Sequence, residues 1–272
     1  MSDYEIIERI DAFCDGMPRQ RAHAEVIGPL VLFVPAGPGW PYYARPRVDT
    51  RLPVDVGHIR AVRARQRELL IPESFEWLEQ TAPAMAHTAT EAGLEVHRHP
   101  LLMLDRLAAA PPLPPGNSVR LMSPADSDLI LAWAVPGVAF GHPGTAAGEA
   151  GVTERDKIAA NHDAGTITLL REQLQSGYSA LASAAGPNGP LAAGSYQLWH
   201  GVAEITGVGA LPASRRRGLG AAVTHALAAD AVARGAQIVF LSATDDEVAR
   251  IYARIGFRVI GTAAIGEPAE AA

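Results

Sequence analysis

The stretch SRRRGLGAA, residues 214–222, places three arginines directly before two glycines that are separated by one residue. The small residues that follow the glycines favour a helix. A helix N-terminus attracts anions through its unpaired N–H groups and its partial positive charge. Glycine allows close approach to the backbone, and arginine adds charge and fork-shaped donors. The pattern predicts a diphosphate site, here called the cradle, made of Arg215, Arg216, Arg217, Gly218, Leu219, Gly220 and Ala221. The alternative is a basic turn that caps an ordinary helix.

The cradle differs from two familiar phosphate-binding motifs. It has no Gly-Lys-Ser/Thr, as a P-loop would, and its Gly-x-Gly lacks the third glycine of a dinucleotide-binding fingerprint. Upstream, Gly207 and Gly209 interrupt an expected strand at 201–211, which is costly unless the backbone there must be bare or bent. We therefore expect a β-bulge in this strand. The alternative is that both glycines pack against an aromatic residue such as Trp199.

The elements around the cradle alternate between strand and helix. We expect a strand at 119–122, a helix from Ser123 to about Val135, an irregular stretch at 136–151, helix at 153–175 and a hairpin whose turn contains Asn188 and Gly189. After the cradle we expect a helix that Gly235 ends, a buried strand at 236–241, a short helix and a closing strand. The N-terminal half repeats the order strand, strand, helix, strand, helix, strand.

Residues 201–261 resemble the GNAT superfamily of acyl-CoA-dependent N-acetyltransferases. Arg215, Gly218 and Gly220 meet the family signature Arg/Gln-x-x-Gly-x-Gly/Ala, and YARIGF matches Tyr-x-x-x-Gly-Phe. Asp245, seven residues before Tyr252, stands where the family often has asparagine. The resemblance implies an α/β fold with a mixed, largely antiparallel sheet flanked by helices. It also implies acetyl-CoA as co-substrate, with its diphosphate at the cradle.

The resemblance further assigns roles to the strand before the cradle and to the residues that move protons. The pantetheine arm would pair with the backbone of Val208 and Ala210, and the Val208 or Gly209 N–H would polarise the thioester carbonyl. Tyr252 would protonate the departing thiolate, its alternative being a core tyrosine with a satisfied hydroxyl.

Glu204 is the best candidate for the general base. It is a charge in an apolar strand, eleven residues before Arg215, and histone-acetylating members of the superfamily place a catalytic glutamate at that spacing. Partial burial would raise its pKa towards neutrality. A solvent-facing Glu204, with ordered water as the base, stays an equal alternative, and His200 and His162 are further candidates.

The proline-rich stretch at 108–118 suggests a domain boundary. We expect a degenerate GNAT-like domain at 1–112 and the acetyltransferase domain at 113–272, in tandem. The N-terminal half offers Gly57 at the corresponding corner but no Arg-x-x-Gly-x-Gly, so it should not bind CoA. The reaction would be direct attack of the amine, because no cysteine lies near the motif to carry an acyl group.

The composition limits the classes of binding partner and indicates the cellular location. The 272 residues carry a net charge of -6, which disfavours nucleic-acid and membrane-surface binding. The one cysteine, Cys14, excludes an internal disulfide, and we expect no metal. Acidic residues near the N-terminus and the lack of a long apolar run indicate a cytoplasmic protein.

The acceptor would be a small-molecule or peptide amine, with residues 136–151 lining its pocket, and a homodimer is left open. A non-catalytic CoA-binding sensor or scaffold, or an acyltransferase for another acyl-CoA or a hydroxyl acceptor, stays an alternative.

Overall fold

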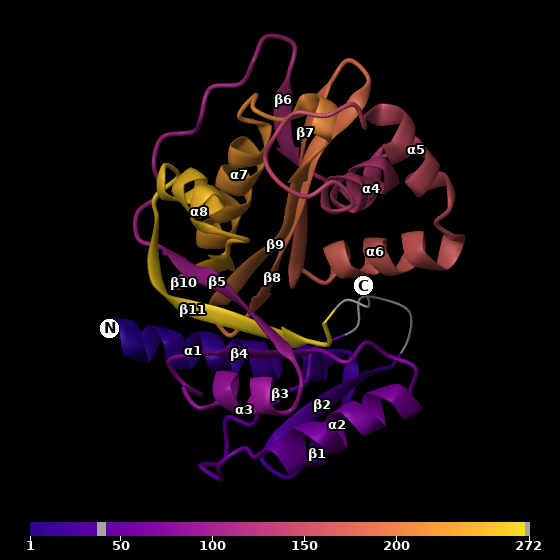
Figure 1. Cartoon of the computed structure of the whole chain (residues 1–272). Helices are drawn as coiled ribbons and strands as arrows, with labels where there is room; N and C mark the ends of the chain where they lie inside the picture. The colour runs from indigo at the N-terminus through magenta and orange to yellow at the C-terminus, as the bar shows by residue number, and fades with distance from the viewer. Residues whose placement is uncertain (37–41, 270–272) are drawn as a thin grey trace. The chain divides into compact units, whose positions relative to one another are not determined.

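The computed structural model describes residues 1–36 and 42–269, shown in Figure 1. The chain forms two compact units. Unit 1 contains Met1–Leu101, Ser242–Asp245 and Val259–Ala272, and unit 2 contains Leu102–Leu241 and Asp246–Arg258. Among the described residues, none of the helices has the length and apolar character that crossing a membrane requires. That residues 1–112 form a domain of their own stays a prediction.

Unit 2 is built on five neighbouring strands of the larger of two sheets. Its strands are β6 (Ser118–Leu121), β7 (Ser179–Gly186), β8 (Gly189–Trp199), β9 (Val202–Ala210) and β10 (Ile238–Ser242), in the spatial order β10-β9-β8-β7-β6. Neighbouring strands are antiparallel except β9 and β10, which are parallel. The predicted mixed, largely antiparallel sheet is therefore confirmed. The predicted hairpin joins β7 to β8, with Gly189 at a φ of +84°.

Helices cover both faces of this sheet. Figure 1 shows α7 (Leu219–Ala233) and α8 (Asp246–Ala253) on one side, and α4 (Leu129–Phe140), α5 (Val152–Ala160) and α6 (Ala164–Gln175) on the other. From β8, the Tyr196 hydroxyl donates to the Asp230 carboxylate of α7 at 2.5 Å. From β9, a Cβ placed on Gly209 would lie 2.6 Å from the Ala139 Cβ of α4. These contacts fix which side of each strand faces which helix.

The first helix of unit 2 starts later than the sequence predicted. Instead of beginning at Ser123 and stopping near Val135, α4 spans Leu129–Phe140. The Asp126 carboxylate accepts the Ser123 backbone N–H at 2.7 Å and pairs with Arg120, which keeps the preceding residues in turns. Pro136 lies inside the helix, where it removes one backbone donor. The buried contacts of Val135 and Val138 hold the helix on the sheet through this position.

Unit 1 contains a small sheet and part of a larger one. The small sheet has the order β1 (Ala22–Ile27), β2 (Leu30–Pro35), β3 (Arg45–Pro46). The second has the order β4 (Phe75–Leu78), β11 (Phe257–Glu267), β5 (Glu95–Leu104), so the last strand of the chain lies between two strands of the N-terminal half. Its helices are α1 (Asp3–Gly16), α2 (Val56–Glu68) and α3 (Met85–Glu91). Leu30, Ile59, Phe75, Trp77 and Ala264 belong to one buried core.

The element order supports the expected likeness between the halves. Both β1-β2-β3-α2-β4-α3-β5 and β7-β8-β9-α7-β10-α8-β11 read three strands, helix, strand, helix, strand. The sequence reading missed α1, although Ser2 and Glu5 form a capping box at its start. It also missed β1 as a separate strand, since it expected two strands before the first helix of the repeated order where the structure has three.

Candidate active site

Strand β9 carries the predicted bulge. It pairs Ser195 with Thr206 and then Ala193 with Gly209, so β9 has one residue more than β8 across this interval. Gly207 takes a φ of +64°, which favours glycine. The alternative of two glycines packed against Trp199 does not hold, because Gly209 faces Ala139 and a Cβ on Gly207 would have no neighbour within 4 Å. The bulge therefore bends the strand just before the cradle.

The two strands next to β9 pair with it over different numbers of residues. In the described sheet, β10 pairs with β9 from Val202 to Glu204, whereas β8 pairs with it as far as Ala210. The stretch with Val208, Gly209 and Ala210 thus lies beyond the described parallel pairing. Backbone groups on such a strand edge are available to an extended ligand. That these three residues hold a cofactor stays a prediction.

The cradle leads into α7 as expected. Gly218 is the N-cap residue, with a φ of +75°, and Leu219 at the start of the helix is 1 % exposed. Among the described residues, no side chain caps this helix N-terminus. In contrast, the Asp55 carboxylate accepts the His58 N–H at the start of α2, the corresponding helix of the N-terminal half. The first-turn N–H groups of α7, at Leu219, Gly220 and Ala221, are thus free of side-chain caps and suited to an anion.

The three consecutive arginines point in three directions. The Arg215 guanidinium donates to the carbonyls of Ala139 at 2.9 Å and His142 at 2.6 Å. Arg216, at a φ of +60°, lines a hollow beside α8. Arg217 donates to Asn117 Oδ1 at 2.9 Å. The sequence predicted that the fork of Arg215 would face a diphosphate, whereas the structure turns it to backbone carbonyls because those of the α4 C-terminus lie beside it.

The hollow beside α8 has a volume of about 510 Å³. The cradle contributes Arg216, Gly218 and Ala221 to its lining. The other lining residues come from the proline-rich segment, Thr145 and the α8 region: Ala109, Pro111, Thr145, Glu247, Arg250, Ile251, Arg254 and Ile255. Three arginines and one glutamate make this lining net positive, which fits an anionic ligand. Sequence reasoning missed Arg250 and Arg254, although their spacing of four residues indicates one side of a helix.

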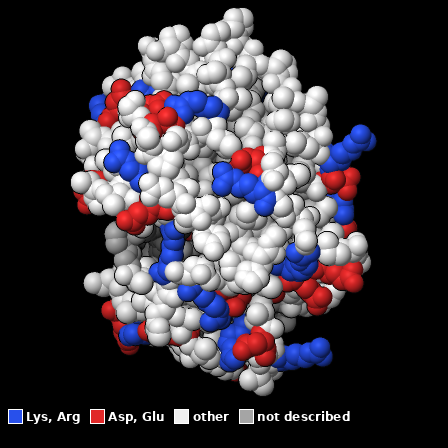
Figure 2. Space-filling view, turned by 180° about the vertical axis from the view of Figure 1, so that it is seen from behind, with Lys and Arg blue, Asp and Glu red and all other residues white. Residues whose placement is uncertain are grey.

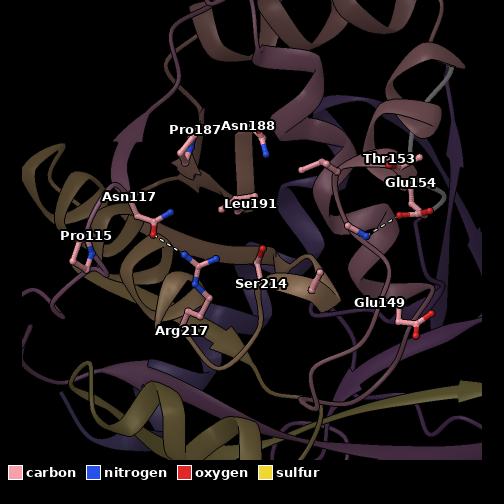
Figure 3. A pocket seen from close by; sticks show the side chains of 13 residues that line it. Pro115, Asn117, Glu149, Thr153, Glu154, Pro187, Asn188, Leu191, Ser214 and Arg217 are labelled. Atoms are coloured by element: carbon pink, nitrogen blue, oxygen red, sulfur yellow. Dashed lines mark hydrogen bonds between the residues drawn. The ribbon is translucent and has the colours of Figure 1, made fainter.

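A second hollow, of about 540 Å³, has Ser214 and Arg217 in its lining (Figure 3). Figure 3 shows Arg217 and its partner Asn117 on one wall, and Glu149 and Glu154 on the opposite wall. Glu154 accepts the Gly151 N–H at 2.7 Å at the start of α5. Because Pro115 and Asn117 line this hollow and Ala109 and Pro111 the other, the expected linker forms a wall of both.

Glu204 lies in a row of polar side chains. Ile205 pairs with Tyr196, which reaches α7, so alternation turns Glu204 and Thr206 to the α4 side of the sheet. Their cross-strand partners, Gln197 and Ser195, share that face. The four residues are partly buried, and Ser195 and Thr206 are joined through their hydroxyls at 3.4 Å. The alternative candidates lie in turns, His200 between β8 and β9 and His162 between α5 and α6.

Tyr252 lies on α8, which packs against α7. Its ring meets Phe257 edge to face, with centroids 6.2 Å apart. The side chain keeps some exposure, and desolvation raises the pKa of Tyr252 to about 12. The hydroxyl is therefore protonated at neutral pH and able to donate a hydrogen bond. Asp245 belongs to unit 1, and its role at the cradle stays a prediction.

Comparison with solved structures identifies the fold. A GCN5-related N-acetyltransferase from Kribbella flavida is 24 % identical, with 97 % of this chain and 96 % of that chain covered at a TM-score of 0.69. A GNAT-family protein from Novosphingobium aromaticivorans is 17 % identical, with 94 % of each chain covered at 0.52. A tandem GNAT protein from the clavulanic acid biosynthesis pathway is 16 % identical, with 87 % and 77 % covered at 0.53. The chain therefore has the GNAT fold.

A family model narrows the resemblance to the part that contains the cradle. Residues 188–264 match the FR47-like protein family, from the β7–β8 turn into β11. No curated protein matches the chain. The resemblance of the C-terminal half to the GNAT superfamily is thus confirmed, while the roles of individual residues stay predictions.

Proposed function

We propose that this protein transfers an acetyl group from acetyl-CoA to the primary amine of a small molecule or peptide in the cytoplasm. One observation carries the proposal. A bulged strand, β9, parts from its parallel neighbour after Glu204 and leads into the N-terminus of α7, which has no side-chain cap among the described residues. An acyl-CoA thioester has an extended arm and a diphosphate, and this arrangement offers a strand edge to the first and backbone N–H groups to the second.

Several groups of this chain fit such a co-substrate. The N–H groups of Leu219, Gly220 and Ala221, together with Arg216, would hold the diphosphate. The backbone of Val208 and Ala210 would pair with the pantetheine arm, and the Val208 or Gly209 N–H would stabilise the oxyanion of the tetrahedral intermediate. Acetyl-CoA itself supplies an acyl group activated as a thioester.

Two side chains would manage the protons. An amine is mostly protonated at pH 7, so Glu204 would accept a proton from the ammonium group, directly or through water, before the nitrogen attacks the thioester carbon. When the carbon–sulfur bond breaks, the electron pair goes to sulfur, and the Tyr252 hydroxyl would donate its proton there. The attacking nitrogen loses its second proton to solvent as the amide forms, and a proton from solvent restores the Tyr252 hydroxyl. Glu204 faces the α4 side of the sheet, and Tyr252 lies on α8. The amine would therefore lose its proton on one side of the sheet, and the sulfur would receive a proton from the other side.

The direct test combines binding and turnover. Calorimetry with CoA measures binding, and thiol release from acetyl-CoA with a panel of amines measures turnover. As a control, Gly220→Glu places a carboxylate at the anion site in a position where a Cβ would only touch Val208 at 3.9 Å, so we expect a folded protein with weakened CoA binding. If the wild-type protein does not bind CoA, the proposal fails. Binding without thiol release for any amine would favour the sensor alternative.

A further inference from the structure

The Arg215 guanidinium is occupied by the backbone of another segment. Its Nη2 donates to the Ala139 and His142 carbonyls, its Nη1 to the Ala146 carbonyl at 3.2 Å, and its Nε lies 3.4 Å from the Ala210 carbonyl. All three nitrogens therefore have carbonyl partners already. Four of the five guanidinium N–H groups are thus engaged, so a bidentate contact with a diphosphate would require at least one of these bonds to break first.

The carbonyls that Arg215 meets belong to a helix end that needs a donor. The last carbonyls of a helix lack intrahelical partners, and a cation near them is favourable. Helix α4 has no basic residue in its own last turn, and Gly-rich chain follows it. Arg215 comes from a distant part of the sequence to supply the missing donor and positive charge.

Further hydrogen bonds attach the segment after α4 to the same region. The Gly148 N–H donates to the Pro212 carbonyl at 3.1 Å, and the Ala213 N–H donates to the Ala150 carbonyl at 2.9 Å. The Thr145 hydroxyl donates to Glu247 of α8 at 2.8 Å. Residues 139–150, here called the acceptor loop, are therefore fixed to the turn before α7 and to α8, with Arg215 making three of the contacts.

We infer that Arg215 is a positioning residue that holds the acceptor loop, and that it does not bind the diphosphate through its side chain. Among the cradle arginines, the anion contact falls to Arg216, which lines the hollow beside α7 and α8. This inference rests on the proposed function for its consequence. Helix α4 covers Gly209 on the sheet face that carries Glu204, so a loosened acceptor loop would impair acceptor binding more than CoA binding.

The test compares neighbouring arginines. Amide hydrogen exchange is measured on peptides covering residues 137–150, and CoA affinity is measured by calorimetry, for the wild type, Arg215→Gln, Arg215→Lys and Arg216→Gln. We expect faster exchange in Arg215→Gln, partial rescue in Arg215→Lys and CoA affinity within about twofold of wild type in both. We expect Arg216→Gln to leave exchange unchanged and to weaken CoA binding roughly tenfold to a hundredfold, the effect of losing one charge-assisted hydrogen bond.

The outcomes separate this inference from the proposed function. A tenfold loss of CoA affinity in Arg215→Gln, or unchanged exchange in it, overturns the inference. If wild type binds no CoA, the proposed function fails, and the exchange data still decide whether Arg215 holds the loop. With any amine found active, Arg215→Gln should raise the KM for that amine and leave the KM for acetyl-CoA unchanged. If Arg215→Gln does not fold, Arg215→Lys decides by the same criteria, since lysine keeps the charge with fewer donors.

Discussion

At the residue scale, the cradle shows what a motif does and does not determine. The order of arginines and glycines was enough to predict a helix N-terminus here, and Gly218 is the N-cap residue of α7. It could not assign the arginines, because their directions depend on a positive φ at Arg216 and on carbonyls about seventy positions earlier in the chain. Main-chain features of the site were thus predictable from sequence, and side-chain partners were not.

Replacing Glu204 tests the base. Glu204→Gln keeps the size of the side chain and removes the proton acceptor, so turnover should fall roughly 10²–10⁴-fold near neutral pH. The loss should shrink as pH rises, because more of the amine is already neutral. Turnover against pH, with an amine found active, measures this, and CoA affinity should stay unchanged as the control. A small loss at every pH would instead point to water as the base.

Replacing Tyr252 tests the acid, and its pH dependence should have the opposite sense. Tyr252→Phe removes the donor to the departing thiolate, so its loss of turnover should grow with pH as protons from solvent become scarcer. In the wild type, burial raises the pKa of Tyr252 to about 12, so its hydroxyl should stay protonated and the rate should show no decline from this group up to about pH 10. A wild-type rate that falls with a midpoint well below pH 10 would contradict the assignment.

A buried ion pair in unit 1 should dominate the stability of its surroundings. Arg45 is 3 % exposed and donates through Nη2 to Asp11, and its Nε has no partner among the described residues. Asp11→Asn should cost about 3–5 kcal/mol, because it removes the carboxylate that pairs directly with a buried guanidinium. Asp49→Asn is the matched control, since Asp49 pairs with Arg47 at 66 % exposure and should cost about 0–1 kcal/mol. Urea unfolding of both variants measures the difference, and equal costs would contradict it.

At the element scale, local patterns predicted most of unit 2. Asn188 and Gly189 mark the β7–β8 turn, Gly207 marks the bulge in β9, and Gly235 follows α7 at a φ of +90°. Each of these signals acts within a few residues of the structure that it specifies. The start of α4 was placed too early because the Arg120–Asp126 pair, which holds the preceding turns, outweighed a favourable capping pattern at Ser123. This competing interaction is also local, since Arg120 lies six residues before Asp126, but the choice between the two partners of the Asp126 carboxylate could not be predicted from the residue pattern alone.

Gly256, just after α8, lies so close to the backbone of Arg106 that its lack of a side chain can be tested by mutation. Gly256 has a φ of +113°, and a Cβ there would lie 1.8 Å from the Arg106 carbonyl oxygen. Gly256→Ala should therefore cost about 2–5 kcal/mol and displace the segment whose Ala108 N–H donates to the Ile255 carbonyl. Gly235→Ala, with no neighbour within 4 Å, should cost only the backbone strain of about 1–2 kcal/mol. Denaturant unfolding compares the two, and similar costs would show that the segment yields easily.

At the scale of the whole molecule, the two similar element orders predict different ligand binding. Helix α7 has no side-chain cap among the described residues, whereas Asp55 caps α2 with a carboxylate that would repel an anion. We therefore expect one CoA per chain. Calorimetry with CoA measures the stoichiometry, and Gly220→Glu should abolish the single site. Two equivalent sites would mean that the N-terminal half is not degenerate.

The distribution of charge on the surface fits an anionic ligand that binds in a small site and not along an extended surface. On the face shown in Figure 2, basic and acidic side chains are interspersed, with broad uncharged areas between them. A nucleic-acid-binding surface would instead gather basic residues. The lining of the hollow beside α8, with Arg216, Arg250 and Arg254, concentrates positive charge on a small area instead.

The position of β11 has a consequence for synthesis on the ribosome. Trp77 and Leu78 of β4 pair with Ala264 and Ala263, which lie far downstream in the sequence and are made much later. While the chain grows, the strands of the N-terminal half leave the ribosome long before the strand that separates β4 from β5. Their edges and the apolar core around Trp77 must stay soluble until β11 has been made. A stop codon shortly before residue 259 should therefore remove a strand from unit 1, although most of that unit has already been made.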